Sequence, residues 1–179
     1  TLGGTDTVLT DPAGVATFSN LVVSGPPGAY TLAFNGTGLT GVTAPAATAL
    51  TAGPAARLAL LTQPASTAQS GVPFATQPVV ELQDAAGNPV SQAGITITAS
   101  IASGGGSLGG TVAQATIANG QATYTDLVLS GTVGPRTIDF TATGLTKVTS
   151  ATVTLAAGAA TTLAKQAGDL FQRLAGLQQ

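Results

Sequence analysis

The sequence repeats itself at a spacing of about 105 residues, and no other feature constrains the fold as strongly. Residues 14–25, GVATFSNLVVSG, return as GQATYTDLVLSG at 120–131. When residues 1–43 are aligned with residues 107–149, 21 of the 43 positions are identical. Self-similarity at a fixed spacing indicates a tandem array of one folding unit.

The repeat divides the chain into three parts. One position is lost after the first aligned stretch, so that LTAG at 50–53 aligns with LAAG at 155–158. We therefore predict that 1–52 is the C-terminal part of one repeat, that 53–157 is a complete repeat and that 158–179 begins a third. On this interpretation the chain is a window of a longer array, in which short apolar linkers hold neighbouring repeats in a semi-rigid row.

The complete repeat has the pattern of a β-sandwich. Val80 and Leu82 alternate with Glu81 and Gln83, and such period-two alternation is typical of half-buried strands. Turn-forming stretches such as DAAGNPV and ANGQ separate the alternating runs. Seven short strands favour two sheets joined in a Greek key, so the predicted fold class is all-β, with tandem immunoglobulin-like β-sandwich repeats. The predicted strands are 57–62, 77–83, 94–101, 111–117, 121–128, 136–142 and 148–155.

The same alternation predicts which side chains form the core. Each large apolar side chain contributes ~1.5–3 kcal/mol when it is buried, so a dozen of them can stabilise one sandwich without disulfides. In the complete repeat these residues are Leu58, Leu60, Val80, Leu82, Ile95, Ile97, Tyr124, Leu127, Ile138, Phe140, Val153 and Leu155. The corresponding residues of the first part are Phe18, Leu21, Tyr30, Leu32, Phe34 and Leu50.

Three stretches of the complete repeat carry a resemblance to a known family. They are PVVELQDAAGNPV at 78–90, GQATYTDLVLSGTVG at 120–134 and TIDFTATGLT at 137–146. The chain resembles, over essentially its whole length, the bacterial immunoglobulin-like repeats of invasin- and intimin-type surface proteins. The resemblance implies a rod of stacked sandwich domains outside a bacterial cell. Repeats of that family act mostly as stalks, with recognition usually at a tip domain, and no tip domain is recognisable in this sequence.

Composition excludes several classes of function. The chain has no Cys, His, Met or Trp, only 7% of its residues are charged, and its net charge is -2. It therefore lacks disulfides, thiolate metal sites and the usual general base at neutral pH. No run approaches the ~18 apolar residues of a membrane span, and an uncharged polar surface is typical of extracellular or cell-surface proteins. Nucleic acid and anionic membranes are disfavoured because the basic residues are scattered: Arg57, Arg136, Lys147, Lys165 and Arg173.

The acidic residues are the remaining candidates for catalysis. Glu81 and Asp84 are close in sequence, but they fall at a strand end and in a turn. Asp126 and Asp139 lie on predicted strands that could be neighbours. Solvated or turn-forming carboxylates are the simpler interpretation, since a fold is no evidence of an active site. We therefore expect a protein that is not an enzyme and has no catalytic residues.

Oxygen ligands for Ca²⁺ are equally sparse. Asp84 with Asn88, or Asp6 with Asp11, could contribute to a site, but calcium takes about six to eight oxygens, several of them often from carboxylates. An Asx turn, in which Asp84 accepts hydrogen bonds from its own loop, explains the first pair better. The glycines of GGGSLGG precede neither a helix nor a lysine, so they do not form a phosphate-binding loop. We predict no metal and no other cofactor.

The last stretch, 161–179, fits two structures. It aligns with the first strand of a repeat, but its apolar residues also fall on one helical face, and Thr162 could cap such a helix. Gly168 and Gly176 oppose a helix at about 1 kcal/mol each, and the alignment favours the start of a repeat. The apolar residues are Leu163, Ala167, Leu170, Phe171, Leu174 and Leu177.

Three functions fit these observations. The first is a non-enzymatic stalk segment of a bacterial cell-surface adhesin or extracellular fibre, with neighbouring repeats and a host or matrix receptor as partners. The second is a self-assembling filament subunit, in which 161–179 adds as a β-strand to residues 1–52 of the next copy. That half-sandwich lacks about three strands and the tail supplies one or two, which weakens the idea. The third is a carbohydrate-binding module, for which Tyr30 and Phe74 are the few aromatic candidates.

Overall fold

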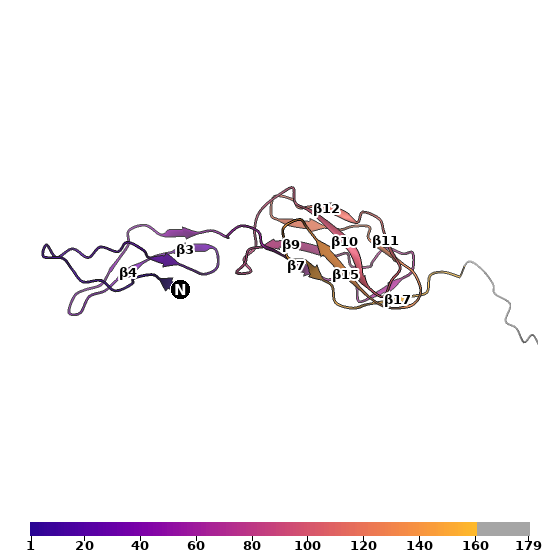
Figure 1. Ribbon diagram of the computed structural model, residues 1–179, viewed down its shortest axis with the longest axis horizontal. Helices are drawn as coiled ribbons and strands as arrows, with labels where there is room; N and C mark the ends of the chain where they lie inside the picture. Colours follow the sequence, from indigo (N-terminus) through magenta and orange to yellow (C-terminus); the bar gives the residue numbers. More distant parts are fainter. Residues whose placement is uncertain (161–179) are drawn as a thin grey trace, which may run out of the picture.

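The computed structural model describes residues 1–160, which form strands, turns and loops without a helix. Figure 1 shows two parts along the long axis: residues 1–52, here called the first part, and residues 57–156, here called the sandwich. The alternatives of strand, helix and docking tail for 161–179 lie outside the described residues.

The sandwich contains two sheets and one separate ladder. The three-stranded sheet consists of β7 (Arg57–Thr62), β9 (Val79–Gln83) and β13 (Gln121–Thr123), with β9 in the centre. The six strands of the second sheet are β8 (Thr67–Gln69), β10 (Thr96–Ser103), β12 (Ala113–Ala115), β15 (Gly134–Thr141), β16 (Val148–Thr149) and β17 (Val153–Ala156). Their order is β12-β10-β15-β17-β8, and β16 also pairs with β15. The separate ladder joins β11 (Ser107–Gly109) to β14 (Val128–Ser130).

The connections confirm the predicted all-β sandwich. Strands far apart in sequence are neighbours, since β9 pairs with β13 and β10 pairs with β15. This is the feature that a Greek key requires. The chain also changes sheets between β7 and β8, because β8 runs parallel to β17 at the edge of the second sheet. All other ladders of the sandwich are antiparallel.

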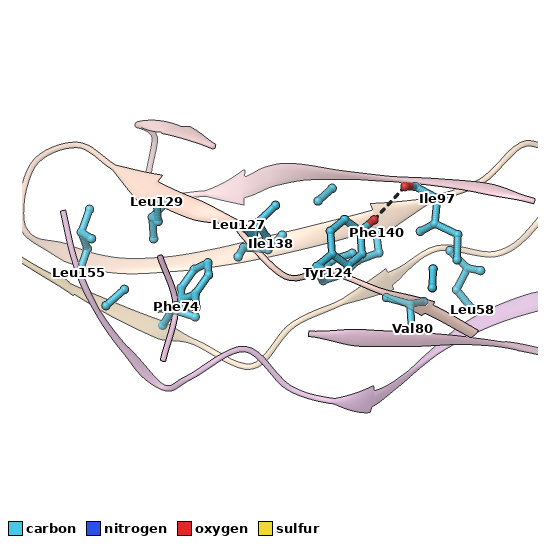
Figure 2. Close-up of a cluster of buried hydrophobic side chains, with 14 of the residues drawn as sticks. Leu58, Phe74, Val80, Ile97, Tyr124, Leu127, Leu129, Ile138, Phe140 and Leu155 are labelled. Atoms are coloured by element: carbon cyan, nitrogen blue, oxygen red, sulfur yellow. Dashed lines mark hydrogen bonds between the residues drawn. The ribbon is translucent and has the colours of Figure 1, made fainter. Parts of the chain in front are cut away.

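The core lies between the two sheets, and its members extend from Leu58 to Leu155 (Figure 2). Ten of the twelve predicted core residues are buried, whereas Leu60 and Ile95 are partly buried and pack against the cluster. The core residues that sequence alternation missed are alanines or lie outside the predicted strands. These additional core residues are Ala68, Phe74, Ala99, Ala122 and Leu129.

Tyr124 occupies the centre of this core. Its ring packs edge-on against Phe140, with the ring centroids 5.5 Å apart and the planes inclined at 60°. Its hydroxyl donates a hydrogen bond of 2.8 Å to the backbone carbonyl of Ile97 on β10, drawn as a dashed line in Figure 2. The buried phenol therefore satisfies its polar group while its ring joins the two sheets.

Two predicted strands are each divided into two. The predicted strand 121–128 is β13 and β14, because Tyr124 and Leu127 are both fully buried. Residues three apart cannot face the same side of one continuous strand, so the backbone must break between them. The predicted strand 148–155 is β16 and β17, and buried Ser150 lies in the break. Its Oγ accepts a hydrogen bond of 2.9 Å from the Ile138 amide.

Two short strands were absent from the prediction, namely β8 and β11. No strand was predicted within SGGGSLGG at 103–110, but Ser107–Gly109 of this stretch form β11. The glycines at 104–106 all have positive φ and reverse the chain. Leu108 then packs against the core opposite Leu129, which draws β11 into a ladder.

The first part consists of three two-stranded ladders. Each reproduces a ladder of the sandwich residue by residue: Leu2 pairs with Val23 as Leu108 pairs with Leu129, and the other two ladders correspond in the same way. The strands are β1 (Leu2–Gly3), β2 (Val22–Val23), β3 (Gly28–Tyr30), β4 (Ala33–Phe34), β5 (Val42–Thr43) and β6 (Thr48–Leu50). The two parts therefore share one pairing scheme, displaced by 106 or 105 positions.

The first part has no buried core. All six of its predicted core residues are only partly buried, whereas all five of their apolar counterparts in the sandwich are at most 1% exposed and belong to the cluster of Figure 2. These side chains are partly exposed because no strands equivalent to β7, β9 and β10 lie over residues 1–50. These residues occupy the core positions of the repeat, but the strands that would cover them are absent from residues 1–50.

Candidate functional site

The junction between the two parts is held by a single carboxylate. Asp84 follows β9, and one of its oxygens accepts a hydrogen bond of 2.9 Å from the backbone amide of Gly53. Gly53 lies in the linker that leaves β6. The linker and Asp84 are each recognisable in the sequence, but the contact between them joins residues 31 positions apart and has no sequence signal.

Asp84 can hold the linker because its own loop fixes the carboxylate. One oxygen accepts hydrogen bonds from the amides of Ala86 and Asn88, at 2.9 and 2.8 Å, and the other accepts from the side-chain amide of Asn88. This is the predicted Asx turn. The Asn88 side chain, followed by the amides of Asn88, Gly53 and Ala86, lowers the pKa of Asp84 to about 2. The group is therefore ionised throughout the physiological range.

The linker is fixed from Gly53 onward. The amide of Ala56 donates to the carbonyl of Gln83 at 2.8 Å, and the carbonyl of Ala56 accepts from Thr146. Arg57 begins β7, and its Nε donates to the side chain of Gln83. Only two residues, 51 and 52, separate Gly53 from Leu50, the last paired residue of the first part. So short a free segment restricts the relative motion of the two parts.

The other acidic candidates are each engaged in a local structural contact. Asp139 on β15 forms an ion pair with Lys147 and accepts from the hydroxyl of Thr149; these contacts, with Lys147 first, lower its pKa. Asp126 accepts from the amide and hydroxyl of Thr111, at 2.9 and 3.1 Å. Asp126 lies in the loop before β14, so it is not on a strand as predicted, and the two carboxylates serve different ladders.

Glu81 accepts a hydrogen bond of 3.2 Å from the side chain of Gln83, and it is not joined to Asp84. Asp6 contacts only its neighbour Thr7, whereas Asp11 accepts from two amides of its own turn. Within residues 1–160, no three acidic side chains lie close enough together to hold a metal ion. The same range contains no helix of the length and apolarity needed to cross a bilayer.

The two aromatic candidates for sugar binding do not form a site. Phe74 is only 4% exposed, since it packs inside the core next to Leu127. Phe74 is therefore not an exposed aromatic residue, because its segment is bonded to the backbone of Leu127 and Val128 beside the core. Tyr30 is partly buried, and its hydroxyl donates to the carbonyl of Pro26 at 2.7 Å. No ring lies beside it to form a stacking platform among the described residues.

The first part presents the clearest concave surface among the described residues. A cavity of about 470 Å³ lies over it, and its lining includes Phe18, Leu21, Leu32 and Phe34. The rings of Phe18 and Phe34 are tilted by 47° with centroids 5.4 Å apart. The lining also contains polar groups, among them Thr1, Asp6 and Asn35, so the apolar side chains share this surface with polar ones.

Comparison with known proteins assigns no family to this chain. No family model and no curated protein matches it. One similar solved structure is a glycosyl hydrolase family 2 member from Bacteroides cellulosilyticus, with TM-score 0.45, 17% identity, and coverage of 65% of this chain and 16% of that chain. Another is domains 4 and 5 of the S-layer protein SbsC, with TM-score 0.34, 18% identity, and coverage of 74% and 66%. The chain thus spans less than two thirds of either.

Proposed function

We propose that this chain is a non-enzymatic structural segment of the stalk of a bacterial cell-surface adhesin or another extracellular fibre. The observation that carries the proposal is the hydrogen bond from Gly53 to Asp84, which fixes the linker three residues after Leu50, the last paired residue of the first part. A stalk must hold successive repeats at a set spacing, and a clamped short linker does this without a large interface.

Two further features support the proposal. The ladders of the first part and of the sandwich have the same registers, as expected for repeats of one unit. The candidate carboxylates of the sandwich each make a structural contact: Asp84 binds the linker, Asp126 binds Thr111 and Asp139 pairs with Lys147. The resemblance to invasin- and intimin-type repeats and the low charge of the chain favour an extracellular location.

The clamp can be tested by distance measurements between spin labels. The chain contains no cysteine, so cysteines at the exposed positions Ala49 and Thr98 would carry the only labels. We expect a narrow distance distribution that broadens in Asp84→Ala. The matched control is Asp126→Ala, which removes a carboxylate that contacts the sandwich alone and should leave the distribution narrow.

One further label separates linker motion from disorder of the first part. A single label at Thr43, on β5, reports by its line shape whether the first part is ordered. A broad distribution in the parent chain, together with an immobilised label at Thr43, would refute the stalk proposal. An unchanged distribution in Asp84→Ala would refute the role of this carboxylate.

A further inference from the structure

Five apolar side chains of the first part are partly exposed and are here called the open face: Phe18, Leu21, Leu32, Phe34 and Leu50. All of them except Leu50 line the cavity of the first part. Their counterparts in the sandwich, in the same order, are Tyr124, Leu127, Ile138, Phe140 and Leu155. Each counterpart is at most 1% exposed. The same positions are therefore covered in one part of the chain and uncovered in the other.

The open face has the strand pairing of its covered counterpart. The three ladders that carry it have the registers of the corresponding ladders in the sandwich. The centroids of Phe18 and Phe34 are 5.4 Å apart, and those of Tyr124 and Phe140 are 5.5 Å apart. Little rearrangement is needed before a partner can pack on this surface.

The sandwich shows what covers such a face. In the sandwich, the buried residues that pack with residues 107–156 include four side chains on β7, β9 and β10: Leu58, Val80, Leu82 and Ile97. All four come from residues 53–106. In addition, β10 pairs antiparallel with β15 along one edge, with Ala99 opposite Phe140 and Ile101 opposite Ile138. The equivalent edge of β4 is unpaired among the described residues, since β4 pairs with β5 alone.

From this correspondence we infer that the open face binds a polypeptide segment with the strand pattern of residues 53–106. The strand equivalent to β10 adds antiparallel to residues 31–35, with the position of Ala99 opposite Phe34 and that of Ile101 opposite Leu32. The strands equivalent to β7 and β9 then cover Phe18 and Phe34. Residues 53–106 of a second copy are not available for this, because they are packed on their own residues 107–156.

The test is a fusion in which a copy of residues 53–106 precedes Thr1, so that the copied Gly106 is followed by Thr1 as it is by Ser107 in the chain. Hydrogen exchange measured by mass spectrometry reports on the amides of 31–35. We expect their protection in the fusion to rise to that of 137–141. Unchanged exchange of 31–35 would overturn the inference.

Two variants of the fused copy show whether the covering is specific. Ile97→Asp in the copy places a charge in the interface and should abolish the new protection. Thr98→Asp in the copy should leave the protection intact, because Thr98 is exposed on the opposite side of β10. Equal behaviour of the two variants would contradict packing on the open face. Since the fusion could disturb folding, the separate 53–106 peptide, added to the full chain, should also protect 31–35.

Two other occupants would be revealed by the same measurement on the parent chain. Protection of 31–35 that rises with protein concentration, together with dimers in light scattering, would mean that a second copy covers the face. Faster exchange after deletion of 161–179 would assign the face to the tail. Either result would overturn the inference. The stalk proposal is tested at the junction and does not depend on this outcome.

Discussion

Phe34 and Phe140 are the same position of the repeat in two surroundings, and truncating each one measures what the covering sheet contributes. Phe140 is fully buried between the sheets, whereas Phe34 is partly exposed. Phe140→Ala removes a ring that contacts Tyr124, and Phe34→Ala removes one that contacts Phe18. The chemical change is identical, so any difference in cost arises from burial.

The expected costs differ by several kcal/mol. Truncating a fully buried phenylalanine to alanine costs about 3–5 kcal/mol, through lost burial and the cavity that remains. A domain of this size loses about 4–8 °C of melting temperature per kcal/mol, so Phe140→Ala should lower the melting temperature of the sandwich by roughly 12–40 °C. Phe34→Ala should change the stability of the sandwich by no more than about 0.5 kcal/mol, because Phe34 lies outside the core cluster.

Isoleucine methyl signals can follow this unfolding, since all five isoleucines of the chain lie between residues 95 and 138. Urea titrations of the parent and the two variants then report on the sandwich alone. Because Phe140→Ala could fail to fold, Phe140→Leu provides a milder variant that should fall between it and the parent. The reasoning is refuted if Phe34→Ala destabilises the sandwich as much as Phe140→Ala, or if Phe140→Ala costs less than about 1 kcal/mol.

Three further outcomes are expected. Tyr124→Phe should lower the free energy of unfolding in urea by about 0.5–1.5 kcal/mol, because the hydrogen bond to the Ile97 carbonyl is lost. Burial raises the pKa of Tyr124, so the parent should also lose stability above pH 10 more steeply than this variant. The lowered pKa of Asp84 stabilises the fold fully above about pH 3.8, and this stabilisation is lost as the pH falls through about 2. Asp84→Asn should therefore lose less stability than the parent in this acid range. Identical losses in the two proteins would exclude this contribution of Asp84. Gly110→Ala should melt well below Gly105→Ala, because both have positive φ but only at 110 would the new Cβ lie 2.0 Å from the Asp126 carbonyl; equal melting temperatures would count against that close approach.

Local sequence determined the fold class and most of the core. Period-two alternation depends only on neighbouring residues, and it correctly placed β7, β9, β10 and β15 and ten of the twelve proposed core side chains. The Asx turn at Asp84 was also predictable, because an aspartate caps amides two and four residues further along its own loop. The internal alignment further identified which positions of the first part correspond to which in the sandwich.

Tertiary structure alone decided the rest. The contact of Asp84 with Gly53, the burial of Phe74 and the pairing of β11 within a glycine-rich stretch all depend on segments distant in sequence. The exposure of the open face is the clearest case, because Phe34 and Phe140 stand in similar local sequences and differ only in what lies above them. Alternation states which face of a strand is apolar, but whether that face is buried depends on a second sheet, which no local pattern contains.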